Sequence, residues 1–388
     1  MIERLKRFNW IMFFAMLGLV GIGTSAIRYA GAIRAEEVFH GMWMNNLQAA
    51  AIGLVLYFAF AFVDYRKVLF FFSLPAYAGA VLLLIAVLVF GDEIYGGKRW
   101  LWFFQPSELA KLCVLMMLSA VCGKDGALGL SIKGSAFKDF LYAAVLVGVP
   151  CVLILAEPDL GTTLVLVPST LLMVFVARIW RKGLSSIVFI GAVAVMAVLG
   201  AVYEAEKPGV SAAQRERILK FVPLKEHQVK RVKVFLFPND DIHDSGYNLR
   251  QSKISIGSGG FRGHVVKSES SAGRVSFLPQ AISMNDFIFC VYAERYGYVG
   301  SIVLLALFAA LLFPICSIAF VSADGRGRLL SLGVGMLLFM HVYINIAMAI
   351  GLVPITGLPL PFISSGRTFL LVCMCSLGLV QSVSIHRN

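Results

Sequence analysis

The chain has 388 residues, of which 59% are hydrophobic and only 14% are charged. Ordinary soluble domains carry about 25% charged residues, so this composition excludes a soluble globular protein and indicates a membrane protein with many spans. The formal net charge of +12 does not predict nucleic-acid binding, because the basic residues are spread over loop ends, where membrane topology and anionic lipid account for them.

Ten stretches are long and apolar enough to cross a bilayer, since a spanning helix needs roughly 20 mostly apolar residues. They are expected at 8 to 26, 46 to 64, 68 to 91, 105 to 122, 139 to 156, 162 to 180, 184 to 203, 287 to 320, 328 to 353 and 365 to 385. The sequence therefore predicts an all-α integral membrane protein, organised as a single polytopic domain over residues 1 to 388.

An even number of spans places both termini on one side of the membrane. Basic residues in short loops mark the cytoplasmic side, and most of them, including Arg7, Lys67, Lys182 and Arg326, fall on the side of the termini. We therefore expect cytoplasmic termini and a large extracytoplasmic loop from 204 to 286, between the seventh and eighth helices.

The segment before the fourth helix carries the first polar groups that enter the membrane. Glu108 and Lys111 are three residues apart, so they share one helix face, either as a structural ion pair or as a functional pair, because ionisable groups inside a membrane are mostly functional. Arg99 is a cation suited to a phosphate group. Trp100 suits an interfacial anchor.

The outer turn between the fifth and sixth helices places two carboxylates directly before a helix. It contains Glu157, Pro158, Asp159 and Thr162. Asp159 suits a helix N-cap, and binding of a cation or a hydroxyl group is the alternative for it.

The long loop has a glycine cluster and ends on a carboxylate. The glycines at 257, 259, 260 and 263 fit a flexible turn as well as an anion-binding nest, but no Gly-Lys-Ser/Thr follows, which excludes a P-loop. Asp286 stands where the loop meets hydrocarbon. Partial desolvation there should raise its pKa toward the range useful for a general base, and nearby cations would oppose that shift.

A run near the C-terminus predicts a broken helix at the outer surface. It contains Pro354, Gly357, Pro359, Pro361 and Gly366. Non-helical backbone at this depth persists only against protein or a water-filled cavity. We expect His341, in the preceding helix, to be a packing residue.

Together these segments resemble the SEDS family, the shape, elongation, division and sporulation proteins that include RodA, FtsW and SpoVE. The matching motifs occur in the family's order and span most of the chain. They are Arg99-Trp100, Phe104 to Lys111, Glu157 to Thr162, Gln251 to Gly260, Leu278-Pro279 with Asp286 to Phe289, and Thr356 to Ser364. The His-Val-x-x-Asn-Ile-x-Met pattern from His341 is most similar to the RodA branch.

The resemblance implies a peptidoglycan glycosyltransferase that polymerises lipid II at the outer face of the bacterial cytoplasmic membrane, for cell elongation and shape. Asp286 matches the family's loop aspartate, which implies a catalytic general base. Glu108 and Lys111 match its cavity pair, and Arg99 and Trp100 match its outer Arg-Trp pair.

Four further residues are expected to contact substrate. Asp159, Gln251 and Ser252 lie in matching motifs, and Arg367 replaces a family glycine, where it would bind diphosphate or reach the lipid headgroups. The run from Gln280 to Asn285 departs from the family, because it is two residues longer and lacks the usual His.

In the implied reaction, a sugar hydroxyl attacks an anomeric carbon with inversion, and undecaprenyl diphosphate leaves. A base assists the attack and cations stabilise the departing diphosphate. Asp286 would be the base. Arg99, Lys111 or a divalent cation, Mg²⁺ or Mn²⁺, would supply the positive charge, and the metal ligands are unknown.

Two alternatives share this composition: a lipid II flippase and a non-catalytic scaffold of the cell-wall synthesis complex. A flippase needs polar groups along its whole path, whereas Arg99, Asp159 and Asp286 are expected on the outer side. The resemblance also implies a class B penicillin-binding protein transpeptidase as partner, beside the lipid II substrate and membrane lipids.

Overall fold

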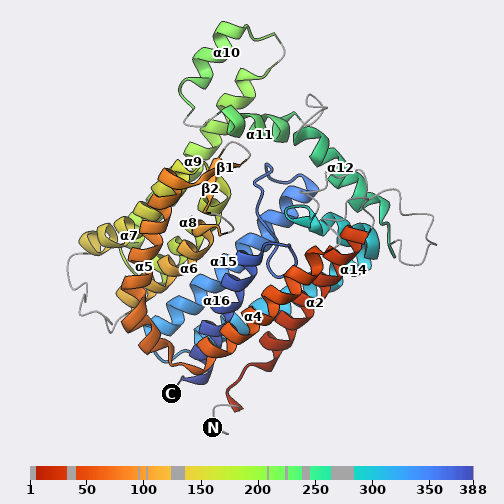
Figure 1. Cartoon of the computed structure of the whole chain (residues 1–388). Helices are drawn as coiled ribbons and strands as arrows, with labels where there is room; N and C mark the ends of the chain where they lie inside the picture. The colour runs from red at the N-terminus through yellow and green to blue at the C-terminus, as the bar shows by residue number, and fades with distance from the viewer. Residues whose placement is uncertain are drawn as a thin grey trace.

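The computed structural model describes residues 6–32, 41–94, 97–101, 104–123, 136–207, 209–222, 226–237, 245–263 and 284–387. Each of the ten predicted spans corresponds to a helix (Figure 1). These helices are α2 (Trp10–Ala32), α4 (Met42–Phe62), α5 (Tyr65–Phe90), α6 (Pro106–Cys122), α7 (Ala136–Ala156), α8 (Leu160–Val176), α9 (Arg181–Ala205), α14 (Ile288–Val321), α15 (Gly325–Ile350) and α16 (Arg367–Ile385).

Eight helices of the described chain are long and apolar enough to cross a membrane. The other two, α6 and α8, have 17 residues each, which is at the short end of the range that spans a bilayer. The prediction of an all-α, multi-pass membrane protein is confirmed.

Both termini lie at the same end of the bundle, as an even number of spans requires (Figure 1). Among the described residues, the opposite end, which we call the loop end, carries three short helices and one hairpin. They are α10 (Ala212–Leu219), α11 (Glu226–Leu236), α12 (Ser245–Ser258) and the antiparallel strands β1 (Asp92–Ile94) and β2 (Gly97–Trp100).

Helices α15 and α16 form the buried centre of the bundle, whereas α9 exposes nearly all of its apolar surface. Small residues permit the closest helix contacts where no water is available to drive packing. On α16, a Cβ at Gly378 would lie 2.6 Å from the carbonyl oxygen of Tyr57 on α4. The glycine therefore lets the two backbones meet.

The eighth predicted span is not one straight helix, because α14 bends at Gly297, whose φ is 66°. The bend frees backbone N–H groups, and the chain after α12 accepts them: Tyr298 N–H donates to Gly260 O (2.9 Å) and Val299 N–H to Phe261 O (3.2 Å). A Cβ at Gly297 would lie 2.3 Å from the nitrogen of Gly263. The loop glycines thus form a tight backbone contact with the bend.

The predicted interruption after α15 is confirmed. Gly351 ends this helix with φ of 79°, and no helix or strand forms between it and α16. The segment 352–366 folds back into the loop end, where Leu358, Leu360 and Phe362 are buried. Its irregular backbone is therefore packed against protein, as the membrane environment requires.

Candidate active site

Asp286 lies in the turn directly before α14 and is partly exposed. It faces the non-helical segment, because a Cβ at Gly357 would lie 3.3 Å from its Oδ2. A Cβ at this position would crowd the carboxylate, and the φ of 75° also favours glycine. The end of the long loop is therefore seated against the interrupted segment after α15.

Charges from three separate elements surround this carboxylate. Burial raises the pKa of Asp286 to about 6, the positive charges of Arg231 and Arg99 oppose that rise, and Asp159 adds to it. This is the balance of desolvation against cations that we expected from the sequence. A carboxyl with this pKa is mainly ionised at neutral pH and can still accept a proton.

Arg99 binds the outer turn before α8. Its Nε donates to Glu157 O (3.3 Å) and its NH2 group donates to Pro158 O. Both acceptors are neutral carbonyl oxygens rather than carboxylates.

Asp159 is the N-cap of α8, which is one of the two roles that the sequence suggested for it. Its Oδ1 accepts from the Thr162 N–H (3.1 Å), and its Oδ2 accepts from the Thr162 hydroxyl (2.8 Å) and from Gln105 Nε2 (3.3 Å). The cap fixes the carboxylate near Asp286. A substrate contact for Asp159 stays a prediction.

The neighbouring Glu157 is fully buried. Neither of its carboxyl oxygens has a hydrogen-bond partner among the described residues. Burial and the charge of Asp159 raise its pKa to about 8, against the opposing charge of Arg99. Glu157 therefore holds a proton through most of the neutral range.

Arg231 of α11 is the site residue that the sequence analysis missed. It donates from NH1 to Ile355 O (3.3 Å) and Thr356 O (3.2 Å), and its charge reaches Asp286. Nothing in the sequence distinguished it from Lys230 and Lys233. Arg231 is the residue that points inward because of the way α11 packs over the interrupted segment after α15.

Glu108 and Lys111 form a separate cluster inside the bundle. Lys111 Nζ lies 2.8 Å from Glu108 Oε2 and donates to His341 Nε2 over 2.8 Å, and it lies over the ring of Phe369. Lys111 and His341 are both 0% exposed. Lys111 therefore links α6 to α15 through His341 and to α16 through Phe369, and the packing role expected for His341 includes this contact.

The remaining predicted residues lie in three places. Trp100 is half-buried on β2, where it pairs with Asp92. Gln251 and Ser252 are on α12, and the Ser252 hydroxyl lies 2.8 Å from the carbonyl oxygens of both Leu249 and Ala349, which fastens α12 to α15. Arg367 is exposed at the start of α16.

Part of the unusual run before Asp286 lies outside the described residues, because the description resumes at Met284. Leu278, Pro279 and Gln280 are among the residues not covered.

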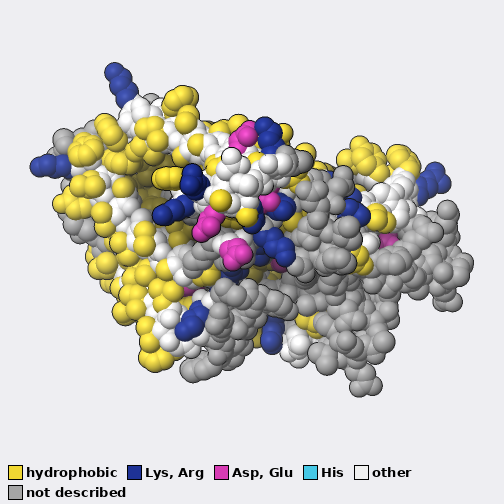
Figure 2. All heavy atoms as spheres, turned by 90° about the horizontal axis from the view of Figure 1, so that it is seen from above, with side chains coloured by type: hydrophobic (Ala, Val, Ile, Leu, Met, Phe, Trp, Pro, Cys, Tyr) yellow, Lys and Arg dark blue, Asp and Glu magenta, His cyan; other side chains and the backbone are white. Residues whose placement is uncertain are grey.

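Figure 2 shows the loop end, where Lys, Arg, Asp and Glu side chains of the described residues gather near the middle of the face.

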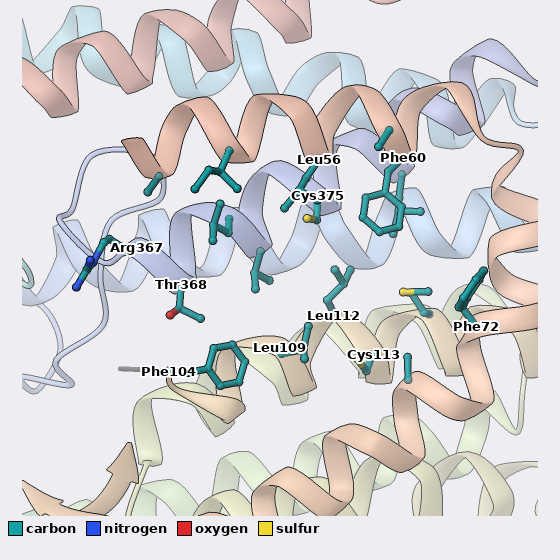
Figure 3. Close-up of a pocket in the computed structure, with 18 of the residues that line it drawn as sticks. Leu56, Phe60, Phe72, Phe104, Leu109, Leu112, Cys113, Arg367, Thr368 and Cys375 are labelled. Carbon is teal, nitrogen blue, oxygen red and sulfur yellow. The ribbon is translucent and has the colours of Figure 1, made fainter. Parts of the chain in front are cut away.

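A groove of about 790 Å³ opens between α4, α5, α6 and α16. Its polar residues lie at the loop end, and the rest of the lining is apolar (Figure 3). Arg367, Thr368 and Phe104 lie at one end, and Phe60 and Phe72 at the other. The groove therefore suits a ligand with a charged head and a long apolar tail.

No group of three or more His, Cys, Asp or Glu side chains within the described ranges is placed to hold a metal ion. The carboxylates at the site stand beside two arginines, which is not the ligand set of a protein-built Mg²⁺ or Mn²⁺ site.

The chain is thus a polytopic membrane protein with a charged site at one end of its bundle and an apolar groove beside it. Residues 6–388 match the FTSW_RODA_SPOVE family, described as cell cycle proteins. The chain belongs to this family, which confirms the resemblance predicted from its motifs.

Named relatives match nearly the whole chain. The peptidoglycan glycosyltransferase MrdB of Escherichia coli K12 is 34% identical over 357 residues, covering 90% of this chain and 87% of the relative. The peptidoglycan glycosyltransferase RodA of Treponema pallidum is 29% identical and covers 100% of this chain and 99% of the relative.

Solved structures share the fold. A chain from a study of the structural coordination of polymerization and crosslinking by a peptidoglycan synthase complex has a TM-score of 0.74 and 28% identity, covering 98% of this chain and 99% of that one. The rod shape determining protein RodA of Thermus thermophilus has a TM-score of 0.68 and 25% identity, with 98% of each chain covered.

Proposed function

We propose that the chain is a peptidoglycan glycosyltransferase that polymerises lipid II into glycan strands for cell elongation and shape. The observation that carries this proposal is the carboxylate of Asp286, which stands at the loop end with Arg99 and Arg231 close enough to act on its charge. The family and the names of its relatives supply the class of reaction.

In the proposed step, Asp286 accepts the proton of a sugar hydroxyl while that oxygen bonds to the anomeric carbon of a lipid-linked glycan. The bond from this carbon to the diphosphate oxygen breaks, and undecaprenyl diphosphate leaves with the electron pair. In this proposal the two arginines would stabilise the negative charge that builds up, because fixed charges in a partly desolvated site are effective at that task.

The groove supports a lipid-linked substrate. Its apolar walls would hold the polyprenyl tail, and Arg367 at the loop end would bind the diphosphate. Trp100, Gln251 and Ser252 remain predicted substrate contacts. For Glu108 and Lys111, which are buried with His341, the geometry favours support of the helices that carry the site.

Positive charge at the site comes from arginine in this proposal. The divalent cation considered from the sequence has no ligand set built by the described residues, so no step depends on it. A chelator in the polymerisation assay tests whether a cation arrives with the substrate diphosphate.

We place the loop end on the extracytoplasmic side of the bacterial cytoplasmic membrane, because the basic residues of the short loops gather at the opposite end. The similarity to a chain of a peptidoglycan synthase complex supports a class B penicillin-binding protein transpeptidase as partner. Such a partner would crosslink the strands that this chain makes.

Polymerisation of purified lipid II, followed on a gel, tests the proposal. Asp286→Asn keeps the shape of the side chain but cannot serve as a base, so we expect product formation to fall roughly 10²- to 10⁴-fold, the usual range for a general base. Glu204→Gln is the control, because Glu204 is an exposed acid at the end of α9 that pairs with Lys207, and it should polymerise normally.

Three outcomes would contradict the proposal. Unchanged polymerisation by Asp286→Asn would remove the assigned base. Transport of labelled lipid II into sealed vesicles by this variant would favour a flippase. A wild-type protein that makes no polymer, alone or with its transpeptidase, would favour a scaffold.

A further inference from the structure

The chain leading into Asp286 is held by hydrogen bonds on three successive carbonyl groups. Met284 O accepts from the Ser365 N–H (3.2 Å), Asn285 O from the Ser364 hydroxyl (2.6 Å), and Asp286 O from Asn345 Nδ2 (2.8 Å). The donors come from α15 and from the segment that follows it. These contacts fix the short stretch of backbone before α14, in which Asn285 and Asp286 form a turn.

Asn345 makes the most specific of these contacts. Its side chain is 0% exposed, and Nδ2 donates both to Asp286 O and to Leu358 O, the latter over 2.6 Å. Its Oδ1 has no partner within the described residues. A flipped amide would aim an acceptor at two carbonyl acceptors, so the observed orientation is dictated by the hydrogen bonds.

The same interrupted segment also adjoins the Asp286 carboxylate and accepts the hydrogen bonds of the neighbouring cation, Arg231. Gly357 adjoins its Oδ2, and Arg231 donates to Ile355 O and Thr356 O. By joining Asp286 O to Leu358 O, the Asn345 amide ties the base to the backbone that positions its neighbouring cation. On α15, His341 lies one turn before Asn345 and bonds to Lys111, which anchors the helix from which the amide projects.

We propose that Asn345 is a positioning residue for Asp286, assisted by Ser364: together they hold the loop backbone so that the carboxylate points at the reacting hydroxyl. This inference rests on the proposed role of Asp286 as the base. Neither residue needs to touch substrate, because the effect acts through the direction of the Asp286 side chain.

Asn345→Leu tests the inference, since it keeps the side-chain shape and removes both donors. A misplacement of about 1 Å at a reacting group lowers rates on the order of 100-fold. We therefore expect kcat to fall by roughly 10- to 100-fold, with KM for lipid II nearly unchanged. Ser364→Ala removes one of the three contacts and should lower kcat by a smaller factor.

The matched control is Gln381→Leu. Gln381 is a second buried amide of the bundle, on α16, and accepts a hydrogen bond from Tyr57 away from the site. Loss of this amide should lower the melting temperature in detergent to a similar degree and leave kcat unchanged. A structural role alone would make Asn345→Leu behave like this control.

The pH profile is a second readout. Arg231 of α11, Arg99 of β2 and Asp159 before α8 face Asp286. Because burial dominates the shift of its pKa, a carboxylate released from the clamp gains water, and the acid limb of kcat should move to lower pH in Asn345→Leu. Gln381→Leu should keep the wild-type limb.

The outcomes separate this inference from the proposed function. Normal polymerisation by Asp286→Asn would overturn the base itself. An inactive Asp286→Asn together with an Asn345→Leu protein of wild-type kcat and pH limb would overturn the positioning role alone. If Asn345→Leu does not fold, Ser364→Ala carries the test, and wild-type kcat and pH limb in that variant would overturn the inference.

Discussion

Burial and positive charge act in opposite directions on Asp286, and their balance sets the pH at which it can accept a proton. Desolvation raises the pKa of this carboxyl, whereas Arg231 and Arg99 favour its ionised form. The result is a group poised close to the working pH of a general base. This balance at Asp286 and the burial of Glu157 each predict a pH dependence.

The first concerns the rate. The base acts as a carboxylate, so kcat should rise with pH through a single ionisation near the pKa of about 6 and level off above it. Initial rates of lipid II polymerisation measured across this range check the limb. A flat profile below pH 6 would show that no group with this pKa controls the step.

The second concerns stability. The folded protein holds the Glu157 proton up to a pKa of about 8, well above the ordinary value of 4.5. Between these values unfolding releases the proton, so stability falls as the pH rises. Glu157→Gln should weaken the drop in melting temperature between mildly acidic and mildly alkaline buffer, with Glu204→Gln as an exposed control.

At the scale of elements, the bend of α14 and the end of α12 depend on each other. The positive φ at Gly297 frees N–H groups in α14, and the carbonyls of Gly260 and Phe261, just after α12, accept hydrogen bonds from them. This contact joins the long loop to the helix that begins beside Asp286.

Gly297→Ala should therefore destabilise the protein. The new Cβ would lie 2.3 Å from Gly263 N at a φ that disfavours L side chains, a combination that costs about 1–3 kcal/mol. Thermal unfolding in detergent measures it. Gly191→Ala is the control, because a Cβ there meets nothing within 4 Å, and its melting temperature should stay level or rise.

Across the whole molecule, the charged site lies at the loop end of the bundle, and the apolar groove runs from that end along α4, α5, α6 and α16 (Figure 3). Arg367 lies at the loop end of the groove (Figure 3). A substrate with a charged head and an apolar tail can therefore lie with its tail at membrane depth and its head near the loop end. The arrangement connects lipid binding to the sugar chemistry.

Ala59→Trp should fill part of the groove near Phe60. Loss of a few buried methylene contacts, each worth about 0.8 kcal/mol, predicts a rise in KM for long-chain lipid II on the order of tenfold. A lipid II analogue with a short tail should be less affected. Ala51→Trp on the exposed face of the same helix is the control, and equal effects from both would argue against the groove as the tail site.

The membrane architecture follows from the sequence, because hydrocarbon imposes its demands on each segment separately. The length of the apolar stretches predicted all ten helices, and the prolines and glycines from Pro354 to Gly366 predicted the break after α15. Motif order identified the family. The position of Asp286 at the edge of an apolar run indicated a raised pKa before any neighbour was known.

The surroundings of that carboxylate were decided only by tertiary structure. Spacing along one helix pairs Glu108 with Lys111, but it cannot show that His341 joins them, that Arg231 reaches over from the loop, or that Asn345 holds the Asp286 carbonyl. These contacts connect residues far apart in the chain and depend on the rotation and depth of whole helices. Those quantities are set by side-chain packing across the bundle, because a bilayer constrains the length of each helix but not the partner that it faces.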